Sequence, residues 1–441
     1  MTGFIEELRW RGLIHQITAE DHLARWISTP GRVAYAGFDP TADSLTIGNL
    51  VPLMLLQHWQ RAGHVPVALA GGATGLIGDP SGKDEERSLR SREEIEANIA
   101  GQRRVYDRVL DFDPARPNAA RLVNNIDWFE SIGFIHMLRE VGKHFSVNEM
   151  IRKDSVRTRL EGREQGISYT EFSYMLLQAY DFLHLFRTHE CRVQMAGSDQ
   201  YGNIVSGIDL IRREQSAARG DVEADAPDAF GFTAPLITRA DGQKIGKTAD
   251  GAIWLTADRT SPYRFFQYWI NVADEDVASQ LRIFTFMAQD EIDALLTAHA
   301  AAPHERAAQR ALARSVTEMI HGPSERQLAE DASEALFSGD VATLDARQLA
   351  AVAAEVPSSE HPTADLAGDG LKLLELLPAT SLASSKRQAR EFLGSGAVSV
   401  NGRKVEGVDA TLASSDVLDG GLTLLRRGRR AWHAIRWTSK S

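Results

Sequence analysis

Three short segments carry glycines, hydroxyl side chains and lysines in patterns that could bind phosphate groups. They are TIGNL at residues 46–50, GGATGLIGDPSGK at residues 71–83 and KIGKT at residues 244–248. Backbone N–H groups of glycine-rich turns and helix N-termini bind phosphate oxygens, and lysines neutralise their charge. Taken singly, the first segment is a weak signal and the third could be a solvated loop. The two lysines of KIGKT could also neutralise a triphosphate.

The glycine-rich segment 71–83 matches neither of the common glycine motifs for nucleotide binding. A Walker motif requires G-x4-G-K-[ST], whereas three residues separate Gly78 from Gly82 and Asp84 follows Lys83. The segment contains no G-x-G-x-x-G either. The sequence therefore indicates neither a Walker ATPase nor a dinucleotide enzyme. So many glycines after a buried strand favour close approach of the backbone to a ligand, with a simple turn as the alternative.

The elements that must position these segments alternate between strand and helix. Residues 33–38 and 65–72 have the composition of strands, and residues 48–62 between them that of a helix. The further elements expected are helices over 91–110, 168–186 and 203–214 and a strand over 191–197. This alternation predicts an α/β fold with a Rossmann-like, parallel, doubly wound sheet.

Changes in composition along the chain predict several domains. We expect a Rossmann-like domain over 1–235, a connection that carries KIGKT over 236–260, an α-helical domain over 261–350, a linker over 351–370 and a small basic α+β domain over 371–441. The linker is expected because its Ala, Glu, Ser, Pro and Gly residues have little periodicity.

Charge and cysteine content limit the partners and the compartment. The 441 residues have a formal net charge of −11, but residues 371–441 hold twelve Lys or Arg against six Asp or Glu. Contact with nucleic acid is therefore expected at this basic end. No apolar run reaches the roughly 18 residues of a membrane span, and no export signal is recognised at the N-terminus. The single cysteine, Cys191, cannot form an internal disulfide, so we expect a cytoplasmic protein with Cys191 as a buried bystander.

Five motifs in one order carry a resemblance to a known family. They are YAGFDPTADSLTIGNL, GGATGLIGDPSGK, YTEFSYMLLQAYDF, QMAGSDQYGN and KIGKT. Together they closely resemble the bacterial tyrosyl-tRNA synthetases, which are class I aminoacyl-tRNA synthetases, over nearly the whole chain. The resemblance implies a ligase that activates L-tyrosine with ATP and then transfers it to the 3′ end of tRNA(Tyr). It also implies a homodimer, Mg²⁺ that arrives with ATP, and no protein-bound metal or membrane.

The two signature segments depart from the family pattern. TIGNL stands where the family has His-Ile-Gly-His, and KIGKT stands where it has Lys-Met-Ser-Lys-Ser. Thr46 and Asn49 therefore replace two histidines. A threonine hydroxyl can still donate to a phosphate oxygen, and an Asn amide can replace a ring N–H. We expect ATP binding to survive, with the contact of Thr46 the most weakened.

A helical spacing supports the tyrosine pocket that the resemblance implies. Tyr174, Gln178 and Asp181 stand at i, i+4 and i+7, so all three can face one cavity. The alternative is a mixed core face made by Tyr174, Leu177 and Asp181. By the resemblance, Asp181 and Tyr35 would bind the phenol of the substrate. The other residues implied around tyrosine are Asp79, Asn125, Gln194 and Gln200.

The resemblance also implies a nucleotide side of the site. Its residues would do catalysis by positioning and charge neutralisation, because phosphoryl chemistry of this kind needs little covalent help. The implied catalytic residues are Thr41, Thr46, Asn49, Lys83, Arg87, Lys244 and Lys247. The implied ATP-binding residues are Gly37, Asp39, Gly48, Asp199, Lys244, Lys247 and Thr248.

Residues 384–405, SSKRQAREFLGSGAVSVNGRKV, resemble a small RNA-binding fold. Lys386, Arg387 and Arg390 fall on one face of its expected helix, and Asn401-Gly402 signals a hairpin turn. These three basic residues are the expected RNA contacts. The helical residues 261–350 would face the anticodon, on the resemblance alone.

Two other functions fit part of the pattern. An RNA-binding scaffold descended from a synthetase would account for the basic end and the altered signature, but not for an intact tyrosine pocket. An aminoacyl-tRNA synthetase specific for tryptophan would share the fold and the nucleotide motifs, but it would not need Tyr35 and Asp181 to bind a phenol.

Overall fold

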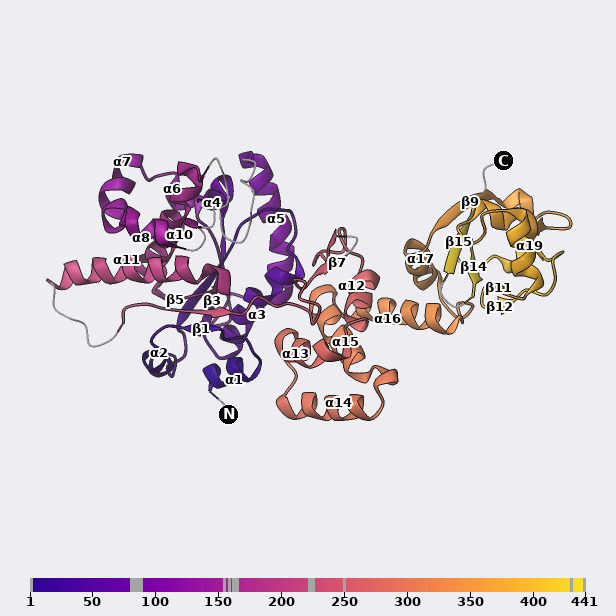
Figure 1. Cartoon of the computed structure of the whole chain (residues 1–441), viewed down its shortest axis with the longest axis horizontal. Helices are drawn as coiled ribbons and strands as arrows, with labels where there is room; N and C mark the ends of the chain where they lie inside the picture. The colour runs from indigo at the N-terminus through magenta and orange to yellow at the C-terminus, as the bar shows by residue number, and fades with distance from the viewer. Residues whose placement is uncertain are drawn as a thin grey trace. The chain divides into compact units, whose positions relative to one another are not determined.

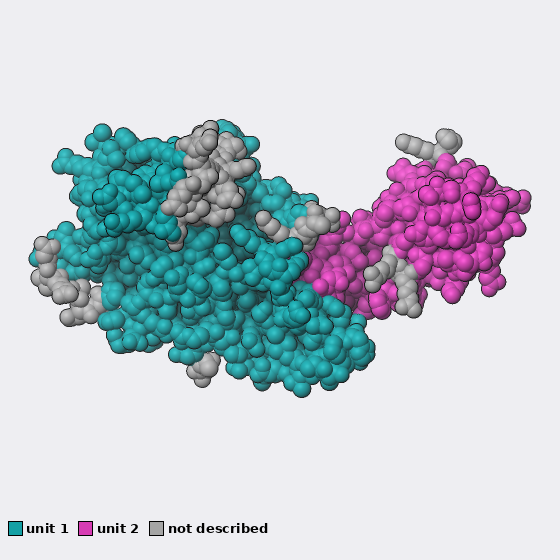
Figure 2. All heavy atoms as spheres, in the orientation of Figure 1, with its two compact units in different colours: residues 1–260, 272–312 teal, residues 261–271, 313–441 magenta. Residues whose placement is uncertain are grey.

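The computed structural model contains two compact units (Figure 1), which Figure 2 colours teal and magenta. It describes residues 3–79, 90–153, 156–157, 160, 166–220, 227–248, 251–428 and 431–438. The first unit consists of residues 1–260 and 272–312, and the second of residues 261–271 and 313–441. The helical residues 261–350, expected as one domain, are thus divided between the units.

A six-stranded sheet forms the centre of the first unit, in the order β1-β6-β5-β2-β3-β4. Every neighbouring pair is parallel except β1 with β6. From β2 the chain adds β3 and β4 on one side, and it then returns to add β5 and β6 on the other. The expected parallel doubly wound sheet is confirmed. The strands are β1 (Gln16–Ile17), β2 (Val33–Phe38), β3 (Val65–Ala70), β4 (Arg121–Asn124), β5 (Cys191–Gly197) and β6 (Phe230–Ala234).

The four helices expected over 48–62, 91–110, 168–186 and 203–214 are present as α3, α5, α10 and α11, with ends shifted by a few residues, and the unit contains further helices that were not expected from the sequence. The helix expected over 168–186 extends to His189, where Glu190 takes a left-handed conformation with φ 56° and ends it. The helices are α1 (Phe4–Trp10), α2 (Glu20–Trp26), α3 (Ile47–Arg61), α4 (Gly72–Ile77), α5 (Arg92–Val109), α6 (Ile126–Phe129), α7 (Phe134–His136), α8 (Val147–Arg152), α10 (Tyr169–His189), α11 (Tyr201–Arg219), α13 (Asp274–Phe284) and α14 (Gln289–Ala301). A short hairpin, β7 (Lys247–Thr248) and β8 (Gly251–Ala252), lies near its end.

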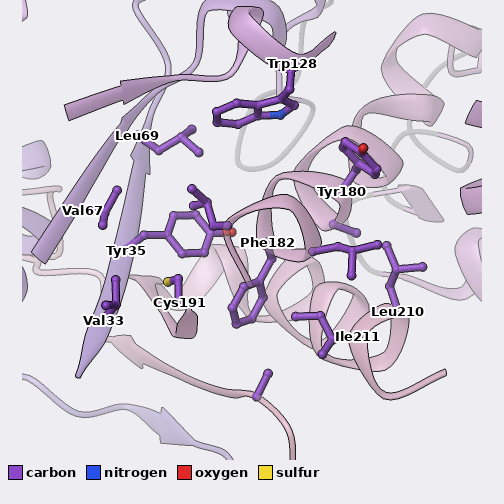
Figure 3. Close-up of a cluster of buried hydrophobic side chains, with 14 of the residues drawn as sticks. Val33, Tyr35, Val67, Leu69, Trp128, Tyr180, Phe182, Cys191, Leu210 and Ile211 are labelled. Atoms are coloured by element: carbon purple, nitrogen blue, oxygen red, sulfur yellow. The ribbon is translucent and has the colours of Figure 1, made fainter. Parts of the chain in front are cut away.

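The core beside the sheet joins β2 to the helix pair α10 and α11. Every residue of the inner strand β3 is buried, as expected for a strand covered on both faces. Figure 3 shows Tyr35 of β2 directed toward α10, where its ring centroid lies 5.4 Å from that of Phe182. Both side chains are almost completely buried. This aromatic contact therefore holds the Tyr35 ring in place beside any site at the end of β2.

The second unit contains a five-stranded sheet in the order β12-β11-β14-β15-β9. Helix α15 (Ala307–His321) crosses from the first unit into the second. The strands are β9 (Ser358–Pro362), β11 (Val398–Val400), β12 (Arg403–Lys404), β14 (Leu422–Arg427) and β15 (Ala431–Thr438), and a separate pair is β10 (Leu371–Lys372) with β13 (Thr411–Leu412). The helices are α12 (Pro262–Ile270), α16 (Pro323–Ser338), α17 (Ala346–Ala354), α18 (Leu373–Leu376) and α19 (Lys386–Gly394). Asn401 and Gly402 have φ values of 48° and 84° in the turn between β11 and β12, as the hairpin expectation requires.

Residues 351–370, which we expected to form a linker, carry regular structure instead. Helix α17 packs Leu349, Val352 and Ala353 into a core with β14 and β15. Strand β9 pairs parallel with β15 from Ser358 to Pro362. It is an edge strand of polar residues that joins the sheet through backbone groups, so no hydrophobic pattern indicated it.

Glycine at position 207 permits the close packing of α10 and α11, and we expect the Gly207→Ala variant to be less stable. A Cβ there would lie 2.9 Å from Cδ1 and 3.1 Å from Cβ of Phe182. Overpacking of a core costs about 1–3 kcal/mol. Urea denaturation should report a loss of this size in the free energy of unfolding.

The matched control is Gly202→Ala on the same helix, where an added Cβ meets nothing within 4 Å. This variant should be as stable as the original chain or slightly more stable, because alanine is the better helix former. Equal stability of both variants would contradict the packing role of Gly207.

Candidate active site

A cavity of about 430 Å³ lies where the direction of sheet winding reverses, between the carboxyl ends of β2 and β5. Tyr35 and Gly37 line it from β2, and Gln194 and Gly197 line it from β5. Because the strands on either side lead to loops that diverge, this point of an open α/β sheet is where ligands bind. Most of the residues expected in the site meet here. The expected residues on its wall are Tyr35, Gly37, Asp39, Thr41, Thr46, Gly48, Asn49, Asp79, Tyr174, Gln178, Asp181, Gln194, Asp199, Gln200 and Lys244.

Helix α10 contributes the side chains that the spacing predicts to share a face. Tyr174, Gln178 and Asp181 all line the cavity, whereas Leu177, which the alternative of a mixed core face includes, does not. The Tyr174 hydroxyl donates to Oδ2 of Asp39 at 3.0 Å. Asn203 Nδ2 donates to Gln178 Oε1 at 2.8 Å. The polar groups on this wall are thus held in fixed orientations.

Asp181 is the most deeply buried carboxyl group of the site, with 2% of its surface exposed. Trp128 Nε1 donates to its Oδ1 at 2.9 Å, and Asn125 Nδ2 donates to its Oδ2 at 3.0 Å. Burial raises the pKa of Asp181 to about 8, against the opposing effect of these two donors. A group that can accept or share a proton therefore stands at the bottom of the cavity.

Two buried polar atoms of the cavity have no hydrogen-bond partner among the described residues. They are the Tyr35 hydroxyl and Gln194 Oε1. Burial, followed by the nearby Asp181, raises the pKa of Tyr35 well above its ordinary value, so the phenol stays protonated and can donate. A buried polar group without a partner costs about 1–3 kcal/mol. Such atoms on a cavity wall indicate where a ligand would bind.

On the opposite side of the cavity the N-terminus of α3 holds the first signature segment. Thr46 is the N-cap residue, and its backbone N–H and its hydroxyl donate to Oδ1 of Asn49 at 3.0 and 2.9 Å. This capping box satisfies donors at the helix start. Thr46, the expected phosphate donor, is thus hydrogen-bonded to Asn49. Because Oδ1 of Asn49 accepts both bonds, its Nδ2 group points away from Thr46.

The glycines of segment 71–83 have a different task from the one expected. Gly72–Ile77 forms helix α4 instead of an open loop, and neither Gly71 nor Gly72 lines the cavity. A Cβ on Gly71 would lie 2.3 Å from Asp39 Oδ1, and one on Gly72 would lie 2.2 Å from Asn124 Oδ1. The close approach that the glycines allow is to protein groups. From the described part of this segment, Thr74 and Asp79 reach the cavity.

Some expected site residues lie elsewhere or outside the described residues. Asn125 is fully buried behind the wall, where it accepts from the Ala73 N–H at 2.7 Å and holds Asp181. The backbone of Lys247 and Thr248 forms β7. Lys83 and Arg87 lie outside the described residues. Lys386, Arg387 and Arg390 are exposed on α19 of the second unit, and Lys386 pairs with Glu375.

Three residues that matter to the site were not anticipated. Trp128 holds Asp181, and Thr74 donates to Asp39 Oδ1 at 2.8 Å. Asn203 links Gln178 to Gln200, whose Nε2 donates to Asp79 Oδ2 at 2.8 Å. Only Asn203 had a usable signal, because it directly follows the GSDQYG segment.

The described residues contain no group of three or more His, Cys, Asp or Glu side chains arranged to hold a metal ion. No helix within the described ranges is long and apolar enough to cross a membrane. The sheet, its reversal point and the polar cavity there define a nucleotide-binding type of α/β protein.

Comparison with known proteins identifies the family. Residues 30–338 match the model of the class I tRNA synthetases (W and Y), and residues 349–435 match the tyrosine--tRNA ligase SYY-like C-terminal domain. The tyrosine--tRNA ligase of Geobacillus kaustophilus is 49% identical over 433 residues, which cover 98% of this chain and 99% of that one. That of Roseiflexus castenholzii is 47% identical over 436 residues, 99% of this chain and 100% of its own.

A solved structure gives the same answer. The C-terminally truncated mitochondrial tyrosyl-tRNA synthetase of Coccidioides posadasii superposes with a TM-score of 0.66 at 33% identity, covering 75% of this chain and 92% of that chain. The chain therefore belongs to the tyrosine--tRNA ligase family of class I tRNA synthetases. The resemblance stated from the sequence is confirmed.

The raised pKa of Asp181 predicts how stability depends on pH. In the unfolded chain Asp181 loses its proton near pH 4, whereas in the folded chain it keeps the proton to about pH 8. Between these values the folded state binds more protons, so the contribution of Asp181 to stability falls as the pH rises. The Asp181→Asn variant should therefore gain stability relative to the original chain by up to about 1.4 kcal/mol per pH unit. Urea denaturation of the ligand-free proteins at pH 5 and pH 7 measures this difference.

Asp209→Asn serves as the control. Partial burial opposes ionisation of Asp209, but hydrogen bonds from Arg212 and Arg213 outweigh burial and lower its pKa. Asp209 is thus ionised in both states above pH 5, and its variant should differ from the original chain equally at the two pH values. A constant difference for Asp181→Asn as well would show that Asp181 titrates normally.

Proposed function

We propose that this protein is a tyrosine--tRNA ligase. It joins L-tyrosine to ATP, forming tyrosyl-adenylate and pyrophosphate, and then transfers the tyrosyl group to the 3′ end of tRNA(Tyr). In the first step the tyrosine carboxylate attacks the α-phosphorus in line, and pyrophosphate leaves. The family membership and the arrangement of the cavity both support this reaction.

The observation that carries the proposal is that the Tyr35 hydroxyl, which has no hydrogen-bond partner, and the buried Asp181 line the same cavity. A substrate phenol can donate to an oxygen of Asp181 and accept from Tyr35 at the same time. Tryptophan would not suit this site, because its indole N–H only donates and the Tyr35 hydroxyl would stay unpaired. Phenylalanine would also leave the Tyr35 hydroxyl unpaired, and it would give Asp181 no donor beyond Trp128 and Asn125.

The other end of the substrate would bind the polar residues nearer the mouth of the cavity. The Asp79 carboxylate balances the ammonium group, and Gln194 Oε1 accepts from it. Tyr174 and Gln178 form the wall between, and Gln200 lies toward the reacting carboxylate. Asn125 acts through Asp181, which it orients, and does not touch tyrosine.

MgATP would bind across the mouth of the cavity as the second substrate. Lys244 and Lys247 neutralise the triphosphate, and Asp199 binds the ribose. Mg²⁺ prefers phosphate and carboxylate oxygens, so it arrives on the nucleotide and needs no protein cage. We assign the remaining nucleotide contacts to Gly37, Asp39, Thr41, Thr46, Gly48, Asn49 and Thr248, and contacts to the departing pyrophosphate to Lys83 and Arg87.

The transfer step requires a surface for tRNA. Lys386, Arg387 and Arg390 are exposed on one helix, and backbone phosphates are the groups that such a cluster binds. We assign RNA contact to these residues in the domain over 371–441, anticodon contact to the helical residues 261–350 and catalysis to residues 1–260. With one buried cysteine, the chain suits the reducing cytoplasm, where we expect the reaction to occur.

The purified protein should catalyse exchange of pyrophosphate into ATP with tyrosine and not with tryptophan. Exchange with phenylalanine should be weaker by about 100-fold, because it leaves the buried Tyr35 hydroxyl without a partner and gives Asp181 no further donor. Measurement of kcat/KM for the three amino acids tests this. No exchange with any of them from folded protein would refute the proposal and favour an RNA-binding scaffold.

Tyr35→Phe and Tyr106→Phe form a matched pair within this experiment. Tyr106 is equally buried, but its hydroxyl bonds to Gln102 and does not line the cavity. Loss of the Tyr35 hydroxyl should raise the KM for tyrosine about three- to tenfold, the worth of one hydrogen bond. The Tyr106 variant should keep the original KM, and equal effects of the two changes would contradict the role of Tyr35.

We also propose that the active form is a homodimer that joins through residues 134–147. Phe134, Ile135 and Val147 are large apolar side chains with 63%, 73% and 57% of their surface exposed. Exposed apolar side chains gathered in one stretch mark interaction sites. The occupant that this family membership favours is a second copy of the chain.

Substitution of Ile135 by Glu should convert the dimer to a monomer, because it buries a charge in the interface. Light scattering at micromolar concentration should report twice the chain mass for the original protein and one chain mass for the variant. Phe337→Glu, at an apolar residue that is 88% exposed in the second unit, should remain dimeric. An original protein that is monomeric would contradict the proposal.

A further inference from the structure

A short extended segment, residues 253–255, connects the two signature segments of the site. Ile47 N donates to Ile253 O at 3.2 Å, and Leu255 N donates to Leu45 O at 2.8 Å. On its other side, Ile253 N donates to Gly246 O at 2.8 Å. The start of TIGNL and the glycine of KIGKT are therefore bonded to the same three residues.

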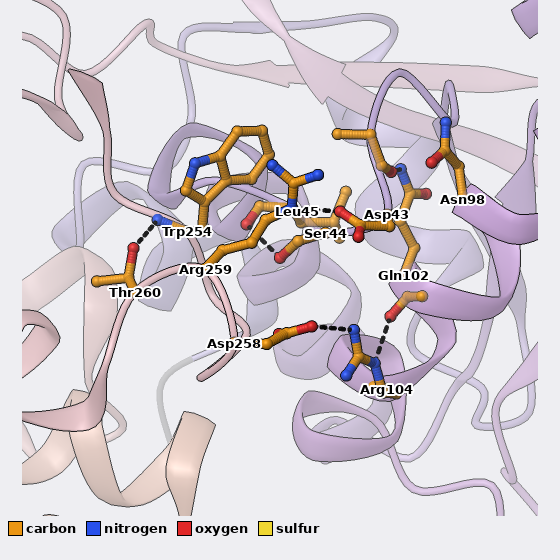
Figure 4. A network of polar contacts seen from close by, with 12 residues as sticks. Asp43, Ser44, Leu45, Asn98, Gln102, Arg104, Trp254, Asp258, Arg259 and Thr260 are labelled. Atoms are coloured by element: carbon orange, nitrogen blue, oxygen red, sulfur yellow. Dashed lines mark hydrogen bonds and ion pairs between the residues drawn. The ribbon is translucent and has the colours of Figure 1, made fainter. Parts of the chain in front are cut away.

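Side chains beyond this segment fasten it to the loop that follows β2. Arg259 pairs with Asp43, and its guanidinium lies 4.6 Å from the centroid of the Trp254 ring (Figure 4). Trp254 N donates to Thr260 Oγ1 at 3.0 Å. One arginine thus joins the loop before TIGNL to the residue at the centre of the connecting segment.

Helix α5 holds the same loop from the other side. A second ion pair, 3.1 Å between Arg104 Nη2 and Asp258 Oδ2, ties α5 to the segment near Arg259. Gln102, which is 1% exposed, donates to Ala42 O at 3.0 Å. A Cβ on Gly101 would lie only 2.1 Å from Asp43 O, so the helix and loop are in close contact. Asp43 therefore has a firm support, and Arg259 is the group that can be released.

We infer that Asp43 and Arg259 are positioning residues for the ATP step, which rests on the proposed function. Neither lines the cavity, so neither touches a substrate there. Their pairing keeps residues 253–255 in place, and these residues hold Gly246 and the adjoining Lys244 against the start of α3. Without this ion pair, residues 253–255 no longer hold the start of α3 and the loop that carries Lys244 in their positions for the triphosphate. The tyrosine pocket on α10 is unchanged.

The test uses three variants. They are Arg259→Ala, Arg259→Lys and a double variant that reverses the pair, in which Asp43→Arg is combined with Arg259→Asp. Arg259→Ala should raise the KM for ATP about fivefold in pyrophosphate exchange, the upper worth of a partly exposed ion pair. The KM for tyrosine should stay within about twofold. Lysine and the reversed pair should each restore part of the loss, because both re-form an ion pair. An equal rise in both KM values, or no rise in either, would overturn the inference.

The control is Arg9→Ala. Arg9 pairs with Glu20 at similar exposure, 52% and 38% of the two side chains against 38% and 41% for Arg259 and Asp43. Its loss should leave both KM values unchanged. A parallel rise in the KM for ATP would overturn the inference by showing a general effect of lost surface charge.

Hydrogen exchange separates this inference from the proposed function. Amide protection at Ile253 and Leu255 should fall in Arg259→Ala and not in Arg9→Ala, whether or not the protein has activity. If the original chain catalysed no tyrosine-dependent pyrophosphate exchange, the proposed function would fail even if the Asp43–Arg259 pair held residues 253–255 in place. Unchanged amide protection in Arg259→Ala would refute the positioning role of the Asp43–Arg259 pair, even in an active enzyme.

Discussion

The pairing of β2 with β5 is the constraint on which the site depends. The two strands run parallel, with Tyr35 opposite Gln194 in register. Because the chain leaves them in opposite directions along the sheet, the loops at their carboxyl ends diverge, and the cavity lies between them. Tyr35 and Gln194 face it as neighbours, and they are also the side chains with unpaired buried atoms. Backbone pairing thus decides which two polar side chains lie side by side on the wall of the cavity.

The polar groups around that pair are nearly all satisfied, which gives the unpaired ones their meaning. Asp181 accepts from Trp128 and Asn125, and Gln178 accepts from Asn203. A satisfied buried network is rigid, so these groups cannot turn to partner Tyr35 or Gln194. Leaving the Tyr35 hydroxyl and Gln194 Oε1 unpaired costs stability in the free protein. A ligand that bonds to both atoms would remove this cost.

Local spacing made one part of the site predictable, and long-range packing concealed the rest. Tyr174, Gln178 and Asp181 were found because helical periodicity is written into consecutive residues. Trp128 comes from a different element, 53 residues before Asp181, and nothing in its neighbourhood indicates a partner there. Composition was misleading for the glycines near position 71, because a missing Cβ accommodates a protein oxygen as readily as a ligand. It was also misleading for β9, whose polar residues pair with β15 through the backbone. The doubly wound sheet, in contrast, follows from strand and helix alternation over many residues.

The altered signature illustrates how helix-end chemistry and binding chemistry share the same residues. At the start of α3, Thr46 and Asn49 form a reciprocal cap, which stabilises a helix by about 1 kcal/mol. The cap also fixes the Asn49 amide, because Oδ1 receives two donors and the Nδ2 group must then point away from them. Neither side chain titrates near neutral pH, whereas histidines at both positions would. The positive charge on this side of the cavity therefore comes from lysines such as Lys244, and their position depends on residues 253–255. In the function that we propose, a neutral helix start and a charged loop bonded to it through residues 253–255 together bind the triphosphate.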